Sequence, residues 1–297
     1  SAASDVYKRQ MFRCNTIFEG EYLLGTAIAR PLIAKKLVEI GKLEGTNIIC
    51  HGATGKGNDQ IRFEIGAHAL NKNIKVIAPW REWDMVSRTD LMSYCKTHQI
   101  PMPASKAEEP PFSMDENLLH ISYEGGVLED LKNSPPEEMW LNTKSLEKAS
   151  ETSEELSIEF SEGDPIAINN KKLPPAEIFR TLNTIGSKHG IGRIDIVESR
   201  VTGMKSRGCY ETPGGTILLK TRRAMESLCL SGKEIKAKDN LIPEYAALIY
   251  EGLWWSNKRT EIQDKVNSIS KKVSGKVSVK LYKGNITIIS RITNSNA

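Results

Sequence analysis

Apolar residues in the first hundred positions recur first at helical spacing and then in short extended runs. The resulting order of helix, strand, helix and strand is typical of an α/β region of the βαβ type. In the second helix, Ile61, Ile65 and Ala69 recur at i, i+4 and i+8, which predicts that they face a core. The predicted elements are a helix over Pro31 to Gly41, a strand over Asn47 to Cys50, a helix over Asn58 to Leu70 and a strand over Ile74 to Ala78.

The pattern breaks between Ile100 and Pro111, where four prolines stand among short polar residues and indicate a domain boundary. Asn142 to Glu162 is rich in Ser, Thr, Lys and Glu and is predicted to be a solvated connection, and Glu198 to Gly215 is predicted to be a polar loop. The second part is predicted to be α+β. Its elements are strands over Ile158 to Phe160, Ile166 to Asn169 and Arg193 to Val197, helices over Pro175 to Gly190, Gly215 to Cys229 and Pro243 to Ser256, and a hairpin of Val277 to Leu281 with Ile286 to Ile289.

Composition narrows the function classes. The chain has 297 residues with 39% hydrophobic and 26% charged positions, and its formal charge of +4 provides no dominant field for nucleic acid, so we expect small-molecule ligands. The five cysteines are scattered without C-x-x-C spacing, which argues against a disulfide framework and a zinc site and favours a reducing compartment. No apolar run approaches the ~20 residues that span a bilayer, so we expect a cytoplasmic protein with no membrane contact.

The residues that carry candidate chemistry begin with a glycine-rich turn, His51 to Asp59, between a predicted strand and a predicted helix. Its three glycines let backbone N–H groups approach a phosphate or carboxylate, and the helix N-terminus adds partial positive charge. A Walker A loop needs Gly, four residues and then Gly-Lys-Ser/Thr, but here Gly57 is followed by Asn58. An ordinary P-loop NTPase is therefore disfavoured. The alternative is a structural turn in which Asn58 caps the helix.

Asn58, Asp59 and Arg62 share one face at the start of that helix. An amide, a carboxylate and a guanidinium together match the ammonium and carboxylate of an amino acid. The alternative is a surface ion pair between Asp59 and Arg62, worth about 0.3 kcal/mol. Because no Ser-His-Asp or Cys-His grouping and no metal-ligand spacing is evident, we assign neither a catalytic nucleophile nor a metal site.

Several long blocks of the sequence, in the right order, resemble argininosuccinate synthase. The resemblance covers nearly everything from Phe12 to Ile292. The blocks are Phe18 to Pro31, the 51 to 59 turn, Ile74 to Arg81, Ser113 to Asn117, His120 to Glu124 and Gly192 to Pro213.

The resemblance implies an ATP-dependent carbon–nitrogen ligase of arginine biosynthesis or the urea cycle. L-Citrulline would condense with L-aspartate through citrullyl-adenylate to give argininosuccinate, AMP and pyrophosphate, with Mg²⁺ accompanying the ATP. It also implies a homotetramer, with a parallel-sheet domain resembling the adenine-nucleotide α-hydrolases (the ATP pyrophosphatases) followed by an α+β synthetase and multimerisation domain. We expect residues 1–10 to be a tag or sequence artefact, residues 11–105 to be a partial nucleotide-binding domain, and residues 106–297 to be the synthetase domain.

The family pattern also implies individual binding residues. It assigns aspartate to Thr54, Asn58 and Asp59, and the nucleotide to Gly52. Ala27 stands where some relatives carry serine, so one contact to citrulline is expected to be absent. The residues that it assigns to citrulline are Tyr22, Asn58, Arg62, Ser113, Ser122, Glu198 and Tyr210.

The sequence departs from the family at its ends. Family members begin with a strand and a Ser-Gly-Gly-Leu-Asp-Thr-Ser loop that holds pyrophosphate, and they continue into a C-terminal arm. This sequence contains neither segment, so we expect an incomplete nucleotide domain and a chain that is inactive by itself. The alternatives are a non-catalytic amino-acid-binding fragment and another adenylating enzyme of the ATP-pyrophosphatase type.

Overall fold

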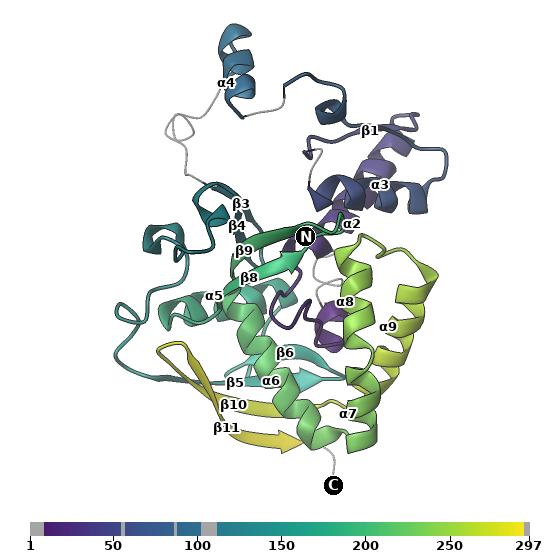
Figure 1. The fold of residues 1–297 in the computed structure, drawn as a ribbon. Coiled ribbons are helices and arrows are strands. Elements are labelled where there is room, and N and C mark those ends of the chain that lie inside the picture. Colours follow the sequence, from purple (N-terminus) through teal and green to yellow (C-terminus); the bar gives the residue numbers. More distant parts are fainter. Residues whose placement is uncertain (1–8, 55–56, 86–87, 102–111, 294–297) are drawn as a thin grey trace.

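A computed structural model describes residues 9–54, 57–85, 88–101 and 112–293 (Figure 1). This part of the chain contains eight α-helices and three sheets. The helices are α2 (Gly25–Leu43), α3 (Asn58–Leu70), α4 (Arg88–Thr97), α5 (Pro175–Lys188), α6 (Pro213–Cys229), α7 (Gly232–Asp239), α8 (Ile242–Tyr250) and α9 (Asn257–Ser270). The strands are β1 (Ile48–Cys50), β2 (Lys75–Ile77), β3 (Ser113–Glu116), β4 (Ile121–Glu124), β5 (Glu154–Ser161), β6 (Asp164–Ile168), β7 (Lys171–Lys172), β8 (Arg193–Ser199), β9 (Lys205–Glu211), β10 (Gly275–Tyr282) and β11 (Asn285–Thr293).

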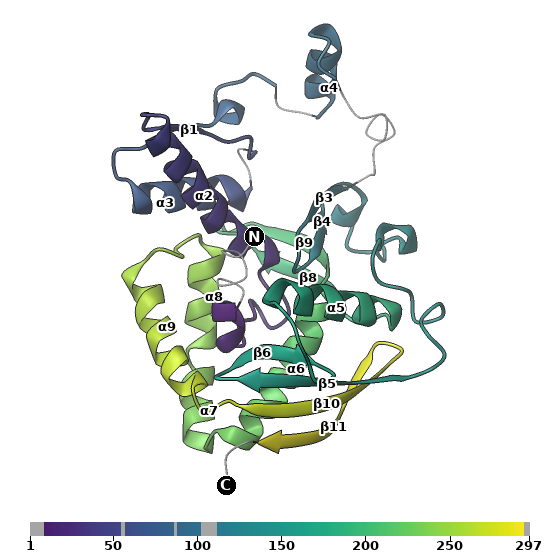
Figure 2. The same ribbon diagram turned by 180° about the vertical axis from the view of Figure 1, so that it is seen from behind.

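The strands form three sheets. Strands β1 and β2 pair in parallel, and the other two sheets are antiparallel, with the orders β11-β10-β5-β6-β7 and β3-β4-β9-β8. The expected class, α/β followed by α+β, is therefore confirmed. Both views show α2, α3 and β1 grouped on one side, next to α8, with the five-stranded sheet at the opposite end (Figures 1 and 2).

Three apolar clusters of different size hold the described elements together, and one of them, beside the four-stranded sheet, consists of Ile121, Tyr123, Leu128, Met139 and Cys209. The main core lies around α5, α6, α8 and the five-stranded sheet, and Trp254 at its centre is fully buried. A small cluster of three buried residues, Ile49, Ala67 and Ile74, joins α3 to β1 and β2. No helix in the described part of the chain is both long enough and apolar enough to cross a bilayer.

Four predictions of local structure were wrong. The expected polar loop contains strand β9, and the expected solvated connection contains strand β5. The helix predicted over Pro243 to Ser256 ends at Tyr250. The basic stretch from Lys258 to Lys283, which the sequence predicts to be a solvated sheet face, instead begins in α9, at Asn257–Ser270. In each case long-range pairing or a polar helix surface outweighs the local composition.

The buried face of α3 also differs from the prediction. Arg62, Gly66 and Ala67 are buried, Ile61 and Ile65 are half-buried, and Ala69 is exposed. The helix is turned this way because α2 packs closely on it: a Cβ added at Gly66 would lie 3.2 Å from the Cβ of Ala34.

A close contact follows the C-terminal end of α8. Gly252 has φ +83°, and a Cβ added there would lie 2.9 Å from Cα of Arg62 on α3. Gly203 has the same φ of +83°, but a Cβ there would meet nothing within 4 Å. An alanine at either position would strain the backbone equally, but only an alanine at position 252 would also collide with a neighbouring helix.

Gly252→Ala is expected to lower the free energy of unfolding by about 1–3 kcal/mol more than Gly203→Ala, because only the first change forces α8 and α3 apart. Urea denaturation of both variants measures the difference. Equal losses in the two variants would show that α8 and α3 do not meet as closely as described.

Candidate active-site cavity

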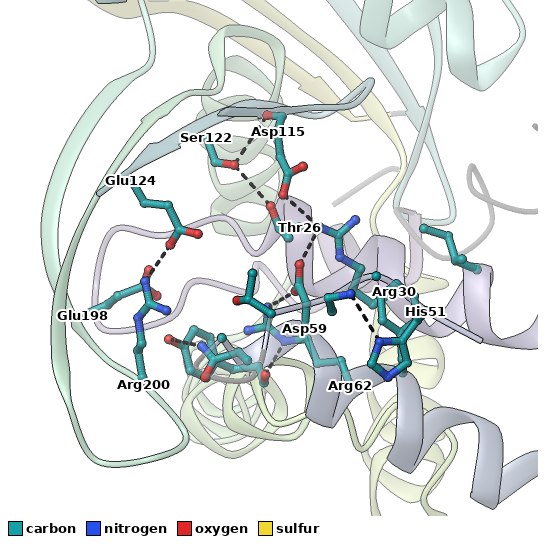
Figure 3. Close-up of a pocket in the computed structure, with 18 of the residues that line it drawn as sticks. Thr26, Arg30, His51, Asp59, Arg62, Asp115, Ser122, Glu124, Glu198 and Arg200 are labelled. Atoms are coloured by element: carbon teal, nitrogen blue, oxygen red, sulfur yellow. Dashed lines mark hydrogen bonds and ion pairs between the residues drawn. The ribbon is translucent and has the colours of Figure 1, made fainter. Parts of the chain in front are cut away.

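A cavity of ≈ 560 Å³ lies between the N-terminal part of α3, α2, the four-stranded sheet and the end of α8 (Figure 3). Charged and hydroxyl-bearing side chains from both halves of the sequence meet in it. The lining includes Tyr22, Thr26, Arg30, His51, Gly52, Thr54, Asn58, Asp59, Arg62, Asp115, Ser122, Glu124, Glu198, Arg200, Tyr210 and Tyr250.

The first wall is the start of α3. Gly57, not Asn58, is the N-cap residue of α3. Asn58 is the first helical residue, and its side chain does not cap the helix but makes hydrogen bonds to other segments. Its Nδ2 donates to the hydroxyl of Tyr250 at 2.9 Å, and its Oδ1 accepts from the backbone N–H of Val201 at 3.1 Å. The helix N-terminus is thereby tied to segments more than a hundred residues further along the chain.

Asp59 lies between two arginines in this wall. Its carboxylate contacts Arg30 at 2.6 Å and Arg62 at 3.0 Å, and Arg30 also reaches Asp115 at 2.8 Å (Figure 3). Since the Arg62 side chain is only 5% exposed, this pair is not the solvated surface pair that was the alternative interpretation. Burial by itself raises the pKa of Asp59, but the hydrogen bond and charge of Arg30, together with Arg62, outweigh it and lower that pKa. Asp59 is therefore held as a carboxylate.

This arrangement predicts a pH-dependent contribution to stability. A lowered folded-state pKa means that Asp59 stabilises the fold above its unfolded pKa of about 3.9 and loses that effect as the pH falls through the folded value. Asp59→Asn is expected to lower the free energy of unfolding by about 1–3 kcal/mol at pH 7, and the gap to the parent should shrink as the pH falls below about 4. Urea denaturation across this range measures the gap, with the exposed Asp264→Asn on α9 as the matched control. A gap that stays constant down to pH 2 would contradict the arrangement.

The second wall is formed by β4, β8 and β9. The Tyr210 hydroxyl donates to Oε1 of Glu198 at 2.6 Å, and Arg200 contacts Glu124 at 2.6 Å. The Tyr22 and Tyr210 rings stack with centroids 4.3 Å apart. Burial, together with neighbouring charges that include Glu198, raises the pKa values of both phenols, so both remain protonated donors.

Glu198 keeps one oxygen for a further partner. Its Oε2 is buried and has no hydrogen-bond partner among the described residues, although the carboxylate lies near enough to Tyr250 to help burial raise the pKa of that phenol. A buried carboxylate oxygen without a donor is unfavourable, so this position is suited to an N–H group of a ligand.

A hydroxyl cluster lies beside these groups. Thr26 Oγ1 is 2.9 Å from Nε2 of His120 and 3.5 Å from Oγ of Ser122, which donates to the Asp115 carbonyl at 3.4 Å. These groups add short polar contacts to the end of the cavity near β3 and β4.

The structure brings together all but one of the site residues proposed from the sequence. Ser113 is exposed at the start of β3 and does not line the cavity. Gly55 and Lys56 of the glycine-rich turn lie outside the described residues. The proposed residues that line the cavity are Tyr22, Gly52, Thr54, Asn58, Asp59, Arg62, Ser122, Glu198 and Tyr210.

Several cavity residues were missed. Arg30 lay within a block used for the resemblance but was given no role, and Tyr250 lay within the helix predicted over Pro243 to Ser256. Asp115 and Glu124 lay within blocks used for the resemblance but were given no role, and Arg200 stood in the expected loop. Glu124 ends β4 and Arg200 follows β8, and a charged residue at the end of a strand was the signal that could have found these two.

Four cations in and near the expected polar loop, which by sequence alone could suit a phosphorylated or acidic ligand, are paired with carboxylates or hydroxyls. Arg193 contacts Glu137 at 2.7 Å, Arg207 contacts Asp195 at 2.6 Å and Lys188 contacts Glu154 at 2.8 Å, while Lys205 donates to the Ser199 hydroxyl. They therefore do not form a joint phosphate site. Among the described residues, no group of three or more His, Cys, Asp or Glu side chains is arranged to hold a metal ion.

Comparison with known proteins agrees with this geometry. The family model described as arginosuccinate synthase N-terminal HUP domain matches residues 3–101, and the one described as arginosuccinate synthase C-terminal domain matches residues 112–296. The argininosuccinate synthase of Helicobacter hepaticus is 58% identical over 281 residues, which are 95% of this chain and 69% of the relative. That of Stutzerimonas stutzeri is 55% identical over 281 residues, with the same shares of 95% and 69%, and that of a Nitratiruptor species is 56% identical over 285 residues, which are 96% and 70%.

The two matches together span the α/β part and the α+β part on either side of the cavity. The identities are high and extend over nearly the whole chain, and they include every strand and helix that lines the cavity. The chain therefore belongs to the argininosuccinate synthase family of carbon–nitrogen ligases.

Proposed function

We propose that this cavity binds L-citrulline and L-aspartate for ATP-dependent argininosuccinate synthesis. The ureido oxygen of citrulline would attack the α-phosphorus of ATP and displace pyrophosphate. The amine of aspartate would then displace AMP from citrullyl-adenylate, lose a proton and form the new carbon–nitrogen bond. The observation that carries the proposal is the convergence of Arg62, Glu198 and Asp59 in one cavity of a chain of this family.

The proposed citrulline contacts match the charged amino-acid end and the neutral ureido end of that molecule. Arg62 is a planar guanidinium and is suited to a carboxylate, and the partnerless Oε2 of Glu198 is suited to an N–H donor. Hydroxyl and amide partners complete the proposed set, which consists of Tyr22, Asn58, Arg62, Ser113, Ser122, Glu198 and Tyr210. Ser113 is retained although it does not line the cavity.

Aspartate is proposed to bind at Thr54, Asn58 and Asp59. The ionised Asp59 carboxylate would accept from the ammonium group of aspartate, since Arg30 and Arg62 keep it charged. Asn58 would lie between the two amino acids, with Gly52 at the nucleotide. Holding both reactants in one cavity lowers the entropic part of the barrier without a covalent intermediate.

ATP is proposed to enter as a substrate with Mg²⁺ on its phosphates, which is the usual way in which proteins bind this ion with nucleotides. The remaining parts of the proposal are a role in arginine biosynthesis or the urea cycle, a cytoplasmic location, a homotetramer, and domains over 11–105 and 106–297. They rest on the family resemblance.

Calorimetric titration of the chain with L-citrulline and then with L-aspartate, followed by pyrophosphate release with Mg-ATP, tests the proposal. We expect one citrulline site per chain and tighter aspartate binding when citrulline and ATP are present. Binding without turnover, even in a chain completed with a family N-terminal segment and C-terminal arm, would favour an amino-acid-binding scaffold. No binding of either amino acid by the folded chain would contradict the proposal.

A further inference from the structure

Tyr250 is the last residue of α8 and lies far in sequence from the residues that the family pattern assigns to substrates. It is 2% exposed, yet it lines the cavity. Its place in an apolar helix suggests a purely structural role, but its polar atoms are directed at the substrate-binding wall.

Two polar atoms of Tyr250 contact two of the proposed citrulline residues. Its hydroxyl accepts from Nδ2 of Asn58 at 2.9 Å, and its carbonyl accepts from Nε of Arg62 at 2.8 Å. The Arg62 guanidinium also lies over the Tyr250 ring, 4.8 Å from its centroid. One residue thus fixes the amide of Asn58 and the fork of Arg62.

The ring itself is held in place from two sides. The Phe18 ring stacks on it with centroids 3.9 Å apart, and the Tyr22 ring meets it edge-on at 6.4 Å. The tight packing of Gly252 against Arg62 holds the end of α8 against α3. Tyr250 is therefore a rigid support for side chains that would otherwise have several rotamers.

We infer that Tyr250 is a positioning residue for citrulline, acting through Asn58 and Arg62, and this inference rests on the function proposed above. The hydroxyl determines which side of the Asn58 amide carries Nδ2, because Oδ1 is engaged by the Val201 N–H. Without the hydroxyl, the amide keeps only the hydrogen bond from the Val201 N–H, so one contact instead of two fixes its orientation toward a bound amino acid. The ring and carbonyl continue to hold Arg62.

Tyr250→Phe tests this role because it removes the hydroxyl and keeps the ring and the carbonyl. We expect the calorimetric dissociation constant for L-citrulline to rise about tenfold, as for the loss of one hydrogen bond in a buried site. In steady-state assays of a chain completed with a family N-terminal segment and C-terminal arm, the KM for citrulline should rise by a similar factor while kcat changes less. A residue with only a structural role would not produce this separation.

Tyr245→Phe is the matched control on the same helix. The Tyr245 hydroxyl donates to Gln263 in the core, and Tyr245 does not line the cavity. This variant should bind citrulline like the parent even if its stability falls. Comparing the two variants separates loss of a buried hydroxyl from loss of a positioned amide.

A double-mutant cycle with Asn58→Ala gives a second test. If the hydroxyl acts through Asn58, the double variant should bind citrulline about as weakly as Asn58→Ala alone. Additive losses, or an unchanged dissociation constant in Tyr250→Phe when the parent binds citrulline, would overturn the inference alone. Failure of the folded parent to bind citrulline would contradict the proposed function and the inference together.

Discussion

Arg62→Ala is expected to weaken L-citrulline binding by about 100-fold or more. The change removes the guanidinium proposed to hold the citrulline carboxylate. It also removes one of the two arginines that contact Asp59 and the Arg62 donor to the Tyr250 carbonyl. A charge-assisted hydrogen bond contributes about 1.5–3 kcal/mol, and the loss of a nearly buried ion-pair partner adds to it. Calorimetric titration with L-citrulline measures the loss of affinity.

Arg81→Ala is the matched control for this change. Arg81 also pairs with a carboxylate of α3, Glu64, but its side chain is 44% exposed and it does not line the cavity. Citrulline affinity should stay within about twofold of the parent. Arg62→Lys is expected to fall between the two, because it keeps the charge and loses the two-pronged geometry. If Arg62→Ala binds as tightly as Arg81→Ala, Arg62 does not hold the substrate.

Glu211→Ala is expected to lower the free energy of unfolding by about 3–5 kcal/mol. The Glu211 carboxylate is 1% exposed and accepts from the Tyr123 hydroxyl and from the backbone N–H groups of Leu141, Asn142 and Thr143. The Thr143 hydroxyl donates to it as well, at 2.6 Å. Removing the carboxylate leaves several buried donors without an acceptor, and each is unfavourable.

Chemical denaturation measures this loss, and hydrogen exchange at the amides of residues 141–143 locates it. Glu211→Gln keeps an acceptor oxygen and is expected to lose about half as much stability. Since Glu211 does not line the cavity, citrulline affinity should change little in either variant that remains folded. A loss below about 1 kcal/mol in Glu211→Ala would show that water replaces the carboxylate.

Elements with strong local signals could be predicted from the sequence. Helix α3 runs over Asn58–Leu70 as predicted, because a glycine-rich turn precedes it and a polar segment follows it. Helix α5 and the β10–β11 hairpin were also found, since a proline pair starts the helix and Lys283-Gly284 forms the turn. These features depend on neighbouring residues alone.

Strand β9 could not be predicted in this way. Its sequence is polar, but it lies between β4 and β8, and its side chains find their partners across the sheet: Arg207 pairs with Asp195 and Tyr210 donates to Glu198. A polar residue with a distant buried partner looks like a loop residue until the fold brings the partner to it.

The candidate site shows the same limit. Asn58, Asp59 and Arg62 were found because they stand on one helix face, whereas Tyr22, Ser122 and Glu198 were proposed only through the family resemblance. Arg30 and Tyr250 were given no role because nothing in the residues next to them in the sequence indicates a binding site. Their importance arises from contacts with α3, which are far away in sequence.

The cluster formed by Ile49, Ala67 and Ile74 is small, and this affects the order in which parts of the protein unfold. Such a cluster provides little cooperativity of its own, so α3 with β1 and β2 is expected to detach as a separate unfolding unit before the main core melts. The hydrogen bonds from Arg62 and Asn58 to Tyr250 then hold the unit of α3, β1 and β2 against the rest of the protein. An amino acid that contacts both sides of the cavity would strengthen this attachment. Substrate would therefore lower the rate at which α3, β1 and β2 detach and become accessible to a protease.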